Sequence, residues 1–99
     1  MSNNPVLSRL GFARKAGRLS LGFSASKEAI VSNKAKLIIV ANDISEKTEK
    51  EIRFFASGKC PVEKLVFDTE AVSKAIGFRA GVIAVNDEGF AQAILNNLL

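Results

Sequence analysis

The sequence predicts a three-layer α/β/α sandwich around a four-stranded mixed sheet. Two short apolar runs, Leu37–Ala41 and Ala80–Val85, have strand length and are rich in β-branched residues, which is typical of strands buried on both faces. Segments with helical spacing of apolar residues alternate with strand-like segments in the order α-β-α-β-α-β-α-β-α. Because the connections are short, we expect helices to pack on both faces of one sheet.

The first half of the chain supplies two helices and two strands. Apolar residues recur at helical spacing after Pro5, which a first helical turn tolerates, and Gly17 stops the pattern. Gly22 lies at the junction between a short strand and the next helix. We therefore expect a helix at 4–16, a strand at 19–22, a helix at 23–33 and a central strand at 37–41.

The second half supplies three helices and two strands. Turn and cap residues follow the central strand at Asn42, Asp43 and Ser45, and Gly77 suits the left-handed position that ends a helix. Asp87 is expected to cap the last helix. We expect a helix ending near 58, a strand at 62–67, a short helix ending at 76, a strand at 80–85 and a last helix after 87.

Length and composition favour a single domain spanning residues 1–99. The longest apolar runs are far shorter than the about 20 residues of a membrane span, and no secretory pattern opens the chain. We therefore expect a soluble, cytoplasmic protein with no membrane partner. Cys60 is the only cysteine, which excludes an internal disulfide. Packing in or beside the core is its expected role, with a reactive thiol as the alternative.

The absence of histidine removes many functions. It excludes histidine acid/base catalysis, histidine-containing triads and nearly all zinc sites. Neither G-x-G-x-x-G nor G-x-x-x-x-G-K-[ST] occurs, and the serines have no histidine to activate them. Acidic pairs lie where helix caps and exposed helix faces place acids. We expect no catalysis, metal, cofactor or small-molecule substrate.

Positive charge is concentrated near the start of the chain. Residues 1–42 contain seven basic residues and one acidic residue, a net charge of +6. Residues 43–99 contain seven basic and nine acidic residues, a net charge of −2. This asymmetry is typical of a protein that contacts a phosphate backbone, and a solvated basic face is the alternative.

The segment Gly22–Lys27 is the first candidate binding site. The first-turn amides of a helix have no partners within the helix, and Gly22 lets another backbone come close, so this helix start suits an anion or a base edge. Ser24, Ser26 and Lys27 add hydrogen-bond donors. An ordinary capping role for Ser24 or Ser26 is the alternative.

Phe78 and Arg79 form the second candidate. A large aromatic residue in a loop after Gly77 is hard to explain as core, whereas an exposed ring and guanidinium suit base stacking and phosphate contact. Packing of the ring is the alternative. Lys15 and Arg18 lie near the end of the first helix, where cations also complement the helix dipole.

Four segments of the chain together carry a family resemblance. They are Ala13–Leu19 (ARKAGRL), Gly22 with Ala29-Ile30 behind it, Lys34–Ser45 (KAKLIIVANDIS) and Ala75–Val82 (AIGFRAGV). In this order they resemble the ribosomal-protein superfamily of archaeal L7Ae and eukaryotic L30e, especially its small bacterial relatives encoded near translation-factor genes. The likeness covers nearly the entire chain.

This resemblance implies an α/β/α sandwich that binds kink-turns, which are sharply bent RNA elements with tandem sheared G·A pairs. It also implies a ribosomal RNA or ribosome partner and no cofactor or reaction. By position, the helix start would enter the groove at the G·A pairs, and the Phe78-Arg79 loop would hold a flipped-out nucleotide. The implied RNA-binding residues are Lys15, Arg18, Gly22, Phe23, Ser24, Ser26, Lys27, Asn42, Asp43, Phe78 and Arg79.

The sequence departs from the family's pattern in the second helix. Ser24-Ala25 stands where relatives have Asn-Glu or Lys-Gln, and Glu28 replaces an expected lysine, with Lys27 one position earlier. Each lost bidentate contact would cost about 1 to 3 kcal/mol of base discrimination, whereas backbone electrostatics would persist.

Two other classes of protein share this scaffold. The chain also resembles protein-interaction modules of stress-response type, in which Ser24-Ala25 would record lost RNA recognition. It further resembles the RNA-binding domain that precedes some ribose methyltransferase domains, although the methyltransferase part is absent from these 99 residues. An interaction module predicts equal, weak and salt-sensitive binding to a kink-turn RNA and to a duplex of equal length.

Overall fold

The computed structural model describes residues 4–98, which form five helices and four strands. The helices are α1 (Pro5–Lys15), α2 (Phe23–Val31), α3 (Glu46–Ala56), α4 (Thr69–Ile76) and α5 (Glu88–Asn96). The strands are β1 (Leu19–Leu21), β2 (Leu37–Val40), β3 (Val62–Lys64) and β4 (Val82–Val85). They form one sheet in the order β1-β4-β2-β3, with β4 antiparallel to β1 and β2, and β2 parallel to β3. The predicted mixed four-stranded sheet is confirmed.

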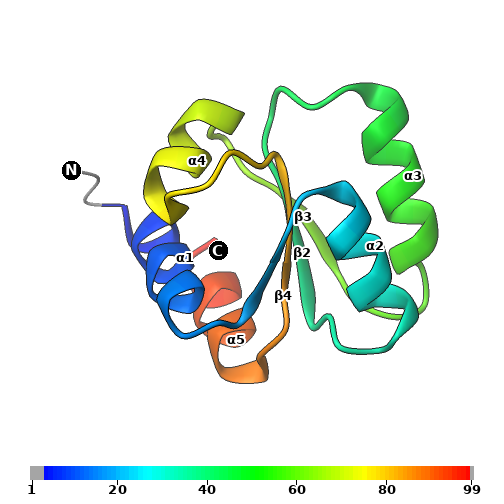
Figure 1. The fold of residues 1–99 in the computed structure, drawn as a ribbon, viewed down its shortest axis with the longest axis horizontal. Coiled ribbons are helices and arrows are strands. Elements are labelled where there is room, and N and C mark those ends of the chain that lie inside the picture. The colour runs from blue at the N-terminus through cyan, green and yellow to red at the C-terminus, as the bar shows by residue number, and fades with distance from the viewer. Residues whose placement is uncertain (1–3, 99) are drawn as a thin grey trace.

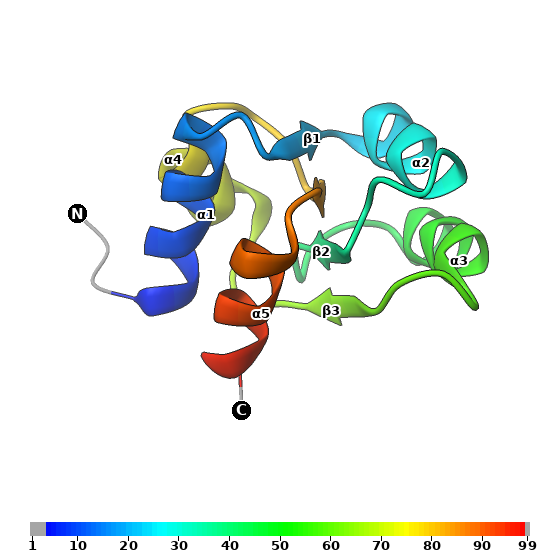
Figure 2. The same cartoon turned by 90° about the horizontal axis from the view of Figure 1, so that it is seen from below.

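Helices cover both faces of the sheet. Figure 1 shows α2 and α3 on one face and α1, α4 and α5 on the other, and Figure 2 shows the same three layers from below. Every residue of β2 and β4 is buried, as their apolar runs predict. Leu37 and Ile39 pack in the core beneath α1, α4 and α5, whereas Ile38 and Val40 pack in the second core beneath α2 and α3. The alternation follows from the pleat of a strand.

Most predicted boundaries lie within one or two residues of those in the structure, and three of the differences bear on the site. The strand expected at 62–67 ends at Lys64, because the chain then bends across the end of β2. The Asn42 amide donates to the Phe67 carbonyl at 2.9 Å, and the Asn42 side chain donates to the Val66 carbonyl at 2.8 Å. α2 ends at Val31, shortly before Asn33, which has φ +62°. The last strand begins at 82, two residues later than expected.

Side chains cap the N-termini of four helices. Asn4, Ser45, Asp68 and Asp87 each accept a backbone N–H of the helix that follows, so the predicted cap at Asp87 is confirmed. Gly77, with φ +74°, ends α4 in the left-handed conformation, also as predicted. Among the helices within residues 4–98, α2 alone begins without such a side-chain cap.

Cys60 is half-buried beside the second core, which confirms its predicted packing role. Burial raises the pKa of its thiol, which disfavours the reactive thiolate. Within residues 4–98, no helix combines the length and the apolar character needed to cross a bilayer. The same part of the chain contains no cluster of three or more side chains of the types that ligate metals.

Candidate nucleic-acid interface

The two predicted binding segments meet at one end of the sheet. The Gly22 amide donates to the Val82 carbonyl at 2.8 Å, and the Ala41 amide donates to the Gly81 carbonyl at 2.9 Å. Because β4 is antiparallel to β1 and β2, its start lies beside the ends of both strands. Figure 1 shows the start of α2 and the loop between α4 and β4 at this end. We call this end, formed by residues 22–25, 42–43 and 78–81, the Gly22 edge.

The start of α2 presents free amide groups at the Gly22 edge. Gly22 has φ +93° and ψ 169°, a conformation that is essentially restricted to glycine. The first helical hydrogen bond runs from the Ser26 amide to the Gly22 carbonyl at 3.0 Å, which leaves the amides of residues 23–25 without partners inside the helix. No acidic residue lies in the first turn. The positive end of the helix dipole is therefore open to an anion.

The loop after α4 holds an aromatic ring and a cation in solvent. Phe78 is 49% exposed, and Arg79 is exposed beside it. The backbone of the loop is anchored at both ends, because the Phe78 amide donates to the Ser73 carbonyl at 3.2 Å and the Ala80 amide donates to the Ser73 hydroxyl at 3.1 Å. The expected exposure of Phe78 and Arg79 is confirmed. A fixed backbone with free side chains suits contact with a ligand.

Asp43 ties the start of α4 to the Gly22 edge. Its carboxylate accepts the Thr69 hydroxyl at 2.6 Å and the Thr69 amide at 2.8 Å. These bonds, with a smaller effect of the Arg79 charge, hold the pKa of Asp43 below its ordinary value of 3.8. Gly81 packs closely against Ile44 and Thr69. A Cβ at Gly81 would lie 2.8 Å from Ile44 Cγ2 and 2.9 Å from Thr69 Oγ1. The exposed Asp43 carboxylate therefore holds the start of α4 beside the strand end at Gly81.

Two residues of the predicted site face inwards. Ser26 is fully buried, and its hydroxyl donates to the Ser20 carbonyl at 3.4 Å, so the expected contact of this hydroxyl with RNA is wrong. Phe23 is half-buried, and its ring packs against the second core. Helical spacing could have shown the burial of Ser26, because Ala29 and Ile30 lie three and four residues further along the same face.

The remaining cations lie at different distances from the Gly22 edge. Lys27 is exposed, but its ammonium lies 4.4 Å from the centroid of the Phe55 ring on α3. Lys15 is exposed at the end of α1 and lines the same groove as Gly77, next to the Phe78 loop. Arg18 lies at the opposite end of β1, about 13 Å away at roughly 3.3 Å per residue. The structure therefore does not bring Arg18 to the Gly22 edge.

Comparison with known proteins fixes the family. The model of the ribosomal protein L7Ae/L30e/S12e/Gadd45 family matches residues 5–95. The chain belongs to this family. It is 31% identical over 100 residues to the large ribosomal subunit protein eL30 of Yarrowia lipolytica, a match that covers 98% of this chain and 92% of that protein. It is 33% identical over 88 residues to the RNA-binding protein YlxQ of Enterococcus faecium, covering 88% and 84% of the two chains.

Solved structures carry the same fold as this L7Ae/L30e-family chain. A Bacillus halodurans protein of unknown function superposes with a TM-score of 0.92 at 26% identity, covering 97% of this chain and 98% of that one. A Giardia lamblia 15.5kD RNA binding protein gives a TM-score of 0.76 at 14% identity, covering 95% and 82%. At that identity the second likeness shows the fold alone.

Three residues at the edge of this L7Ae/L30e-family chain escaped the sequence analysis. Thr69 and Gly81 act through contacts with residues distant in sequence, for which no local signal exists. Val66 is 83% exposed in the loop after β3, next to Asn42, although the predicted strand at 62–67 included it. Asn42 and Asp43, which the family resemblance implied as RNA-binding residues, are exposed, and both side chains bond within the protein. We therefore assign them a positioning role.

Proposed function

We propose that this L7Ae/L30e-family chain binds folded RNA through the Gly22 edge and catalyses no reaction. One observation carries the proposal: an uncapped helix start is joined, through the 2.8 Å bond between Gly22 and Val82, to a loop that exposes Phe78 and Arg79. Free amides suit phosphate or base acceptors, an exposed ring suits an unstacked base, and a guanidinium suits phosphate. The similarity to eL30 and to the RNA-binding protein YlxQ supports it.

The arrangement favours bent RNA, and we propose a kink-turn as its ligand. The deep groove of a regular RNA helix is too narrow for protein side chains, and its bases are stacked out of reach. An RNA that fits a helix start beside an exposed aromatic ring must have a widened groove next to an unstacked base. A kink-turn supplies both features. Since several relatives are large ribosomal subunit proteins, we propose ribosomal RNA in the cytoplasm as the setting.

Base discrimination is expected to be modest, because the first turn of α2 carries short side chains. Ser24 is exposed and Ala25 is half-buried, so neither supplies a bidentate contact to a base. Recognition then rests on RNA shape, on backbone amides and on the exposed ring. The binding constant should fall with salt, and Lys15→Gln should reduce that salt dependence by about one phosphate contact without changing which RNA is preferred.

The test is a calorimetric titration with a kink-turn RNA and with a straight duplex of equal length. Wild-type protein should bind the kink-turn more tightly. Phe78→Ala with Arg79→Ala should weaken that binding at least about thirtyfold, since base stacking and a charged hydrogen bond each contribute roughly 1 to 3 kcal/mol and about 1.4 kcal/mol corresponds to a factor of ten. The melting temperature should hardly change, because both side chains are exposed.

The matched control is Arg53→Ala with Phe54→Ala. This pair also joins an exposed cation to an exposed ring, 75% exposed in the case of Phe54, but it lies on α3. It should leave RNA affinity unchanged. Equal and weak binding to both RNAs, with no effect of the Phe78 and Arg79 substitutions, would overturn the proposal and favour a protein-interaction module.

A further inference from the structure

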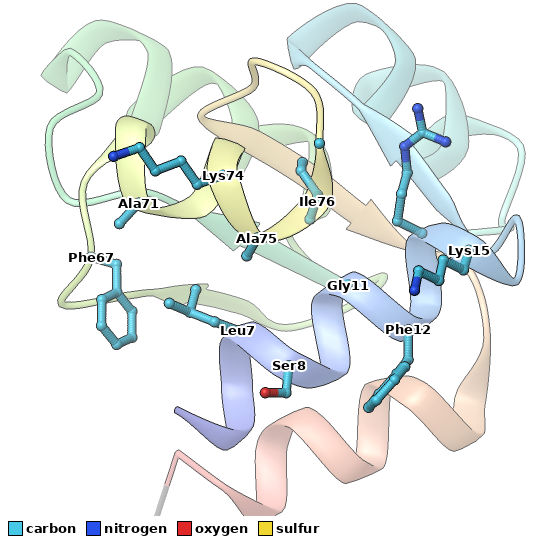
Figure 3. Close-up of a pocket in the computed structure, with 12 residues that line it drawn as sticks. Leu7, Ser8, Gly11, Phe12, Lys15, Phe67, Ala71, Lys74, Ala75 and Ile76 are labelled. Atoms are coloured by element: carbon cyan, nitrogen blue, oxygen red, sulfur yellow. The ribbon is translucent and has the colours of Figure 1, made fainter. Parts of the chain in front are cut away.

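A large groove runs between α1 and α4, outside the Gly22 edge. Its volume is about 1020 Å³, and it is open to solvent along one side. The nearly buried Leu7 and Ile76 line it together with the half-buried Phe67, Gly11 and Ala75 (Figure 3). We call it the α1–α4 groove. Its most exposed apolar side chain is that of Phe12, and an exposed ring beside an apolar groove is a candidate for contact with a partner.

The floor of the α1–α4 groove is built from small residues on two closely packed helices. A Cβ at Gly11 would lie only 2.9 Å from the Ala75 carbonyl oxygen, so glycine lets the two backbones approach. Ala71 lies one turn before Ala75 on the same face of α4. Small side chains between two helices leave a trough whose ends are flanked by Phe67 and Phe12, as Figure 3 shows. Phe12 is 57% exposed.

The charged side chains that line the α1–α4 groove are cations. Within the described part of the chain they are Arg14, Lys15 and Lys74, and the Lys74 ammonium also lies 3.3 Å from the carboxylate of Glu70, an exposed ion pair. Figure 3 places Lys15 on the α1 side and Lys74 on the α4 side, with Gly11 and Ala75 between them. The helix dipoles alone would favour cations at these helix ends. They do not explain the apolar trough between the cations or the exposed ring of Phe12.

We infer that the α1–α4 groove docks an acidic amphipathic helix of a partner protein. Apolar side chains spaced at i, i+3, i+4 and i+7 would enter the trough, and flanking carboxylates would meet Lys15 and Lys74. The 11 residues of α1 span about 16 Å, which sets the length of the docked segment at about three turns. This inference does not depend on RNA binding at the Gly22 edge.

Other occupants fit the α1–α4 groove less well. RNA would bring phosphates to the cations but has no aliphatic groups for the trough. Its bases stack on flat aromatic surfaces, which the groove offers only at its ends, in Phe12 and Phe67, and not along the trough of Gly11, Ala71 and Ala75. A second copy of the chain would bring the same cations and repel. A drug-sized molecule requires a pocket that encloses most of its surface, and the groove is open.

The probe is a designed helical peptide of about 16 residues, with leucine and phenylalanine on one face and glutamate on the other. Its control carries lysine in place of each glutamate. Nuclear magnetic resonance shifts of the isotope-labelled protein should map the acidic peptide to α1 and α4. The lysine peptide should bind about tenfold more weakly or worse, because it places like charges together.

Two variants test which side chains hold the acidic peptide. Lys15→Gln with Lys74→Gln should weaken binding about tenfold, and Phe12→Ala should weaken it by a similar factor. All three side chains are exposed, so folding should persist. The matched controls lie on the other face of the molecule, in α3: Lys47→Gln with Lys50→Gln, and Phe54→Ala, which should leave binding unchanged.

Three results would overturn this inference. The first is equal binding of both peptides, or peptide shifts that map away from α1 and α4. The second is a titration in which kink-turn RNA, and not the acidic peptide, shifts the groove amides, which would assign the groove to the RNA surface. The third is a dimer, seen by sedimentation, that Phe12→Ala dissociates, since a second copy would then be the occupant. The first and third outcomes leave the proposed RNA binding untouched.

Discussion

Gly22→Ala isolates the backbone conformation that opens the start of α2. The substitution adds one methyl group, and nothing lies within 4 Å of the new Cβ, so no steric clash contributes. The cost comes from forcing alanine to φ +93° and ψ 169°, or from breaking the bond to Val82 as the backbone relaxes. That cost is about 1 to 3 kcal/mol. It should lower the melting temperature by roughly 4 to 8 °C per kcal/mol in a domain of this size.

Urea unfolding measures this loss as a lower midpoint at an unchanged slope. Gly58→Ala is the control, because Gly58 also has a positive φ, +75°, and open space around it, but lies after α3. Both variants should be destabilised, and only Gly22→Ala should also weaken RNA binding. A Gly22→Ala protein that is more stable by about 0.4 to 1 kcal/mol would refute the reasoning, since that gain is expected where alanine fits the native backbone.

Three further substitutions probe the surroundings of the Gly22 edge. Gly81→Ala should destabilise the protein by about 1 to 3 kcal/mol in urea, because its Cβ would press on Ile44 and Thr69, and wild-type stability would argue against that close packing. The pKa of Asp43 is lowered in the folded protein, so its ionised carboxylate stabilises the fold at pH values above the ordinary pKa of 3.8. This contribution is lost as the pH falls through the lowered pKa. Asp43→Asn should therefore lower the melting temperature at about pH 7, and its difference from wild type should shrink as the pH falls below 3.8 and through the lowered pKa of Asp43, whereas a constant difference would exclude ionisation as the cause. Ser26→Ala should leave RNA affinity unchanged and stability within about 1 kcal/mol, and a large loss of affinity would contradict the burial of its hydroxyl.

Local patterns accounted for most of the fold. The runs that became β2 and β4 are buried on both faces, and such strands have a compositional signature that needs no knowledge of their neighbours. The predicted end of the third strand was wrong, because Leu65 is buried although it lies in a loop, and a buried apolar residue is equally compatible with a strand. The apolar run Leu65–Phe67 does not distinguish these two situations. The bond from the Asn42 side chain, which pins that loop, comes from a distant part of the chain.

The residues of the candidate site were predicted one by one, and the family resemblance supplied the expectation that they act on one RNA. Gly22 and Phe78 were each recognised from local features, namely a glycine at a helix start and an aromatic residue in a loop. Their juxtaposition depends on the pairing of β1 with β4, which no local pattern shows. The direction of single side chains was the other gap. Ser26 was taken for a donor because of its chemistry, although its place on the helix turns it into the core.

The central claim is that the free amides of α2 and the Phe78 loop form one RNA-binding surface. The most direct test is a titration of the isotope-labelled protein with kink-turn RNA, followed by nuclear magnetic resonance. The largest shifts should fall on the amides of Phe23, Ser24 and Ala25 and on those of Phe78 and Arg79, with little change in α5. Largest shifts in α5 or on the outer face of α3, with the first turn of α2 unmoved, would contradict the claim.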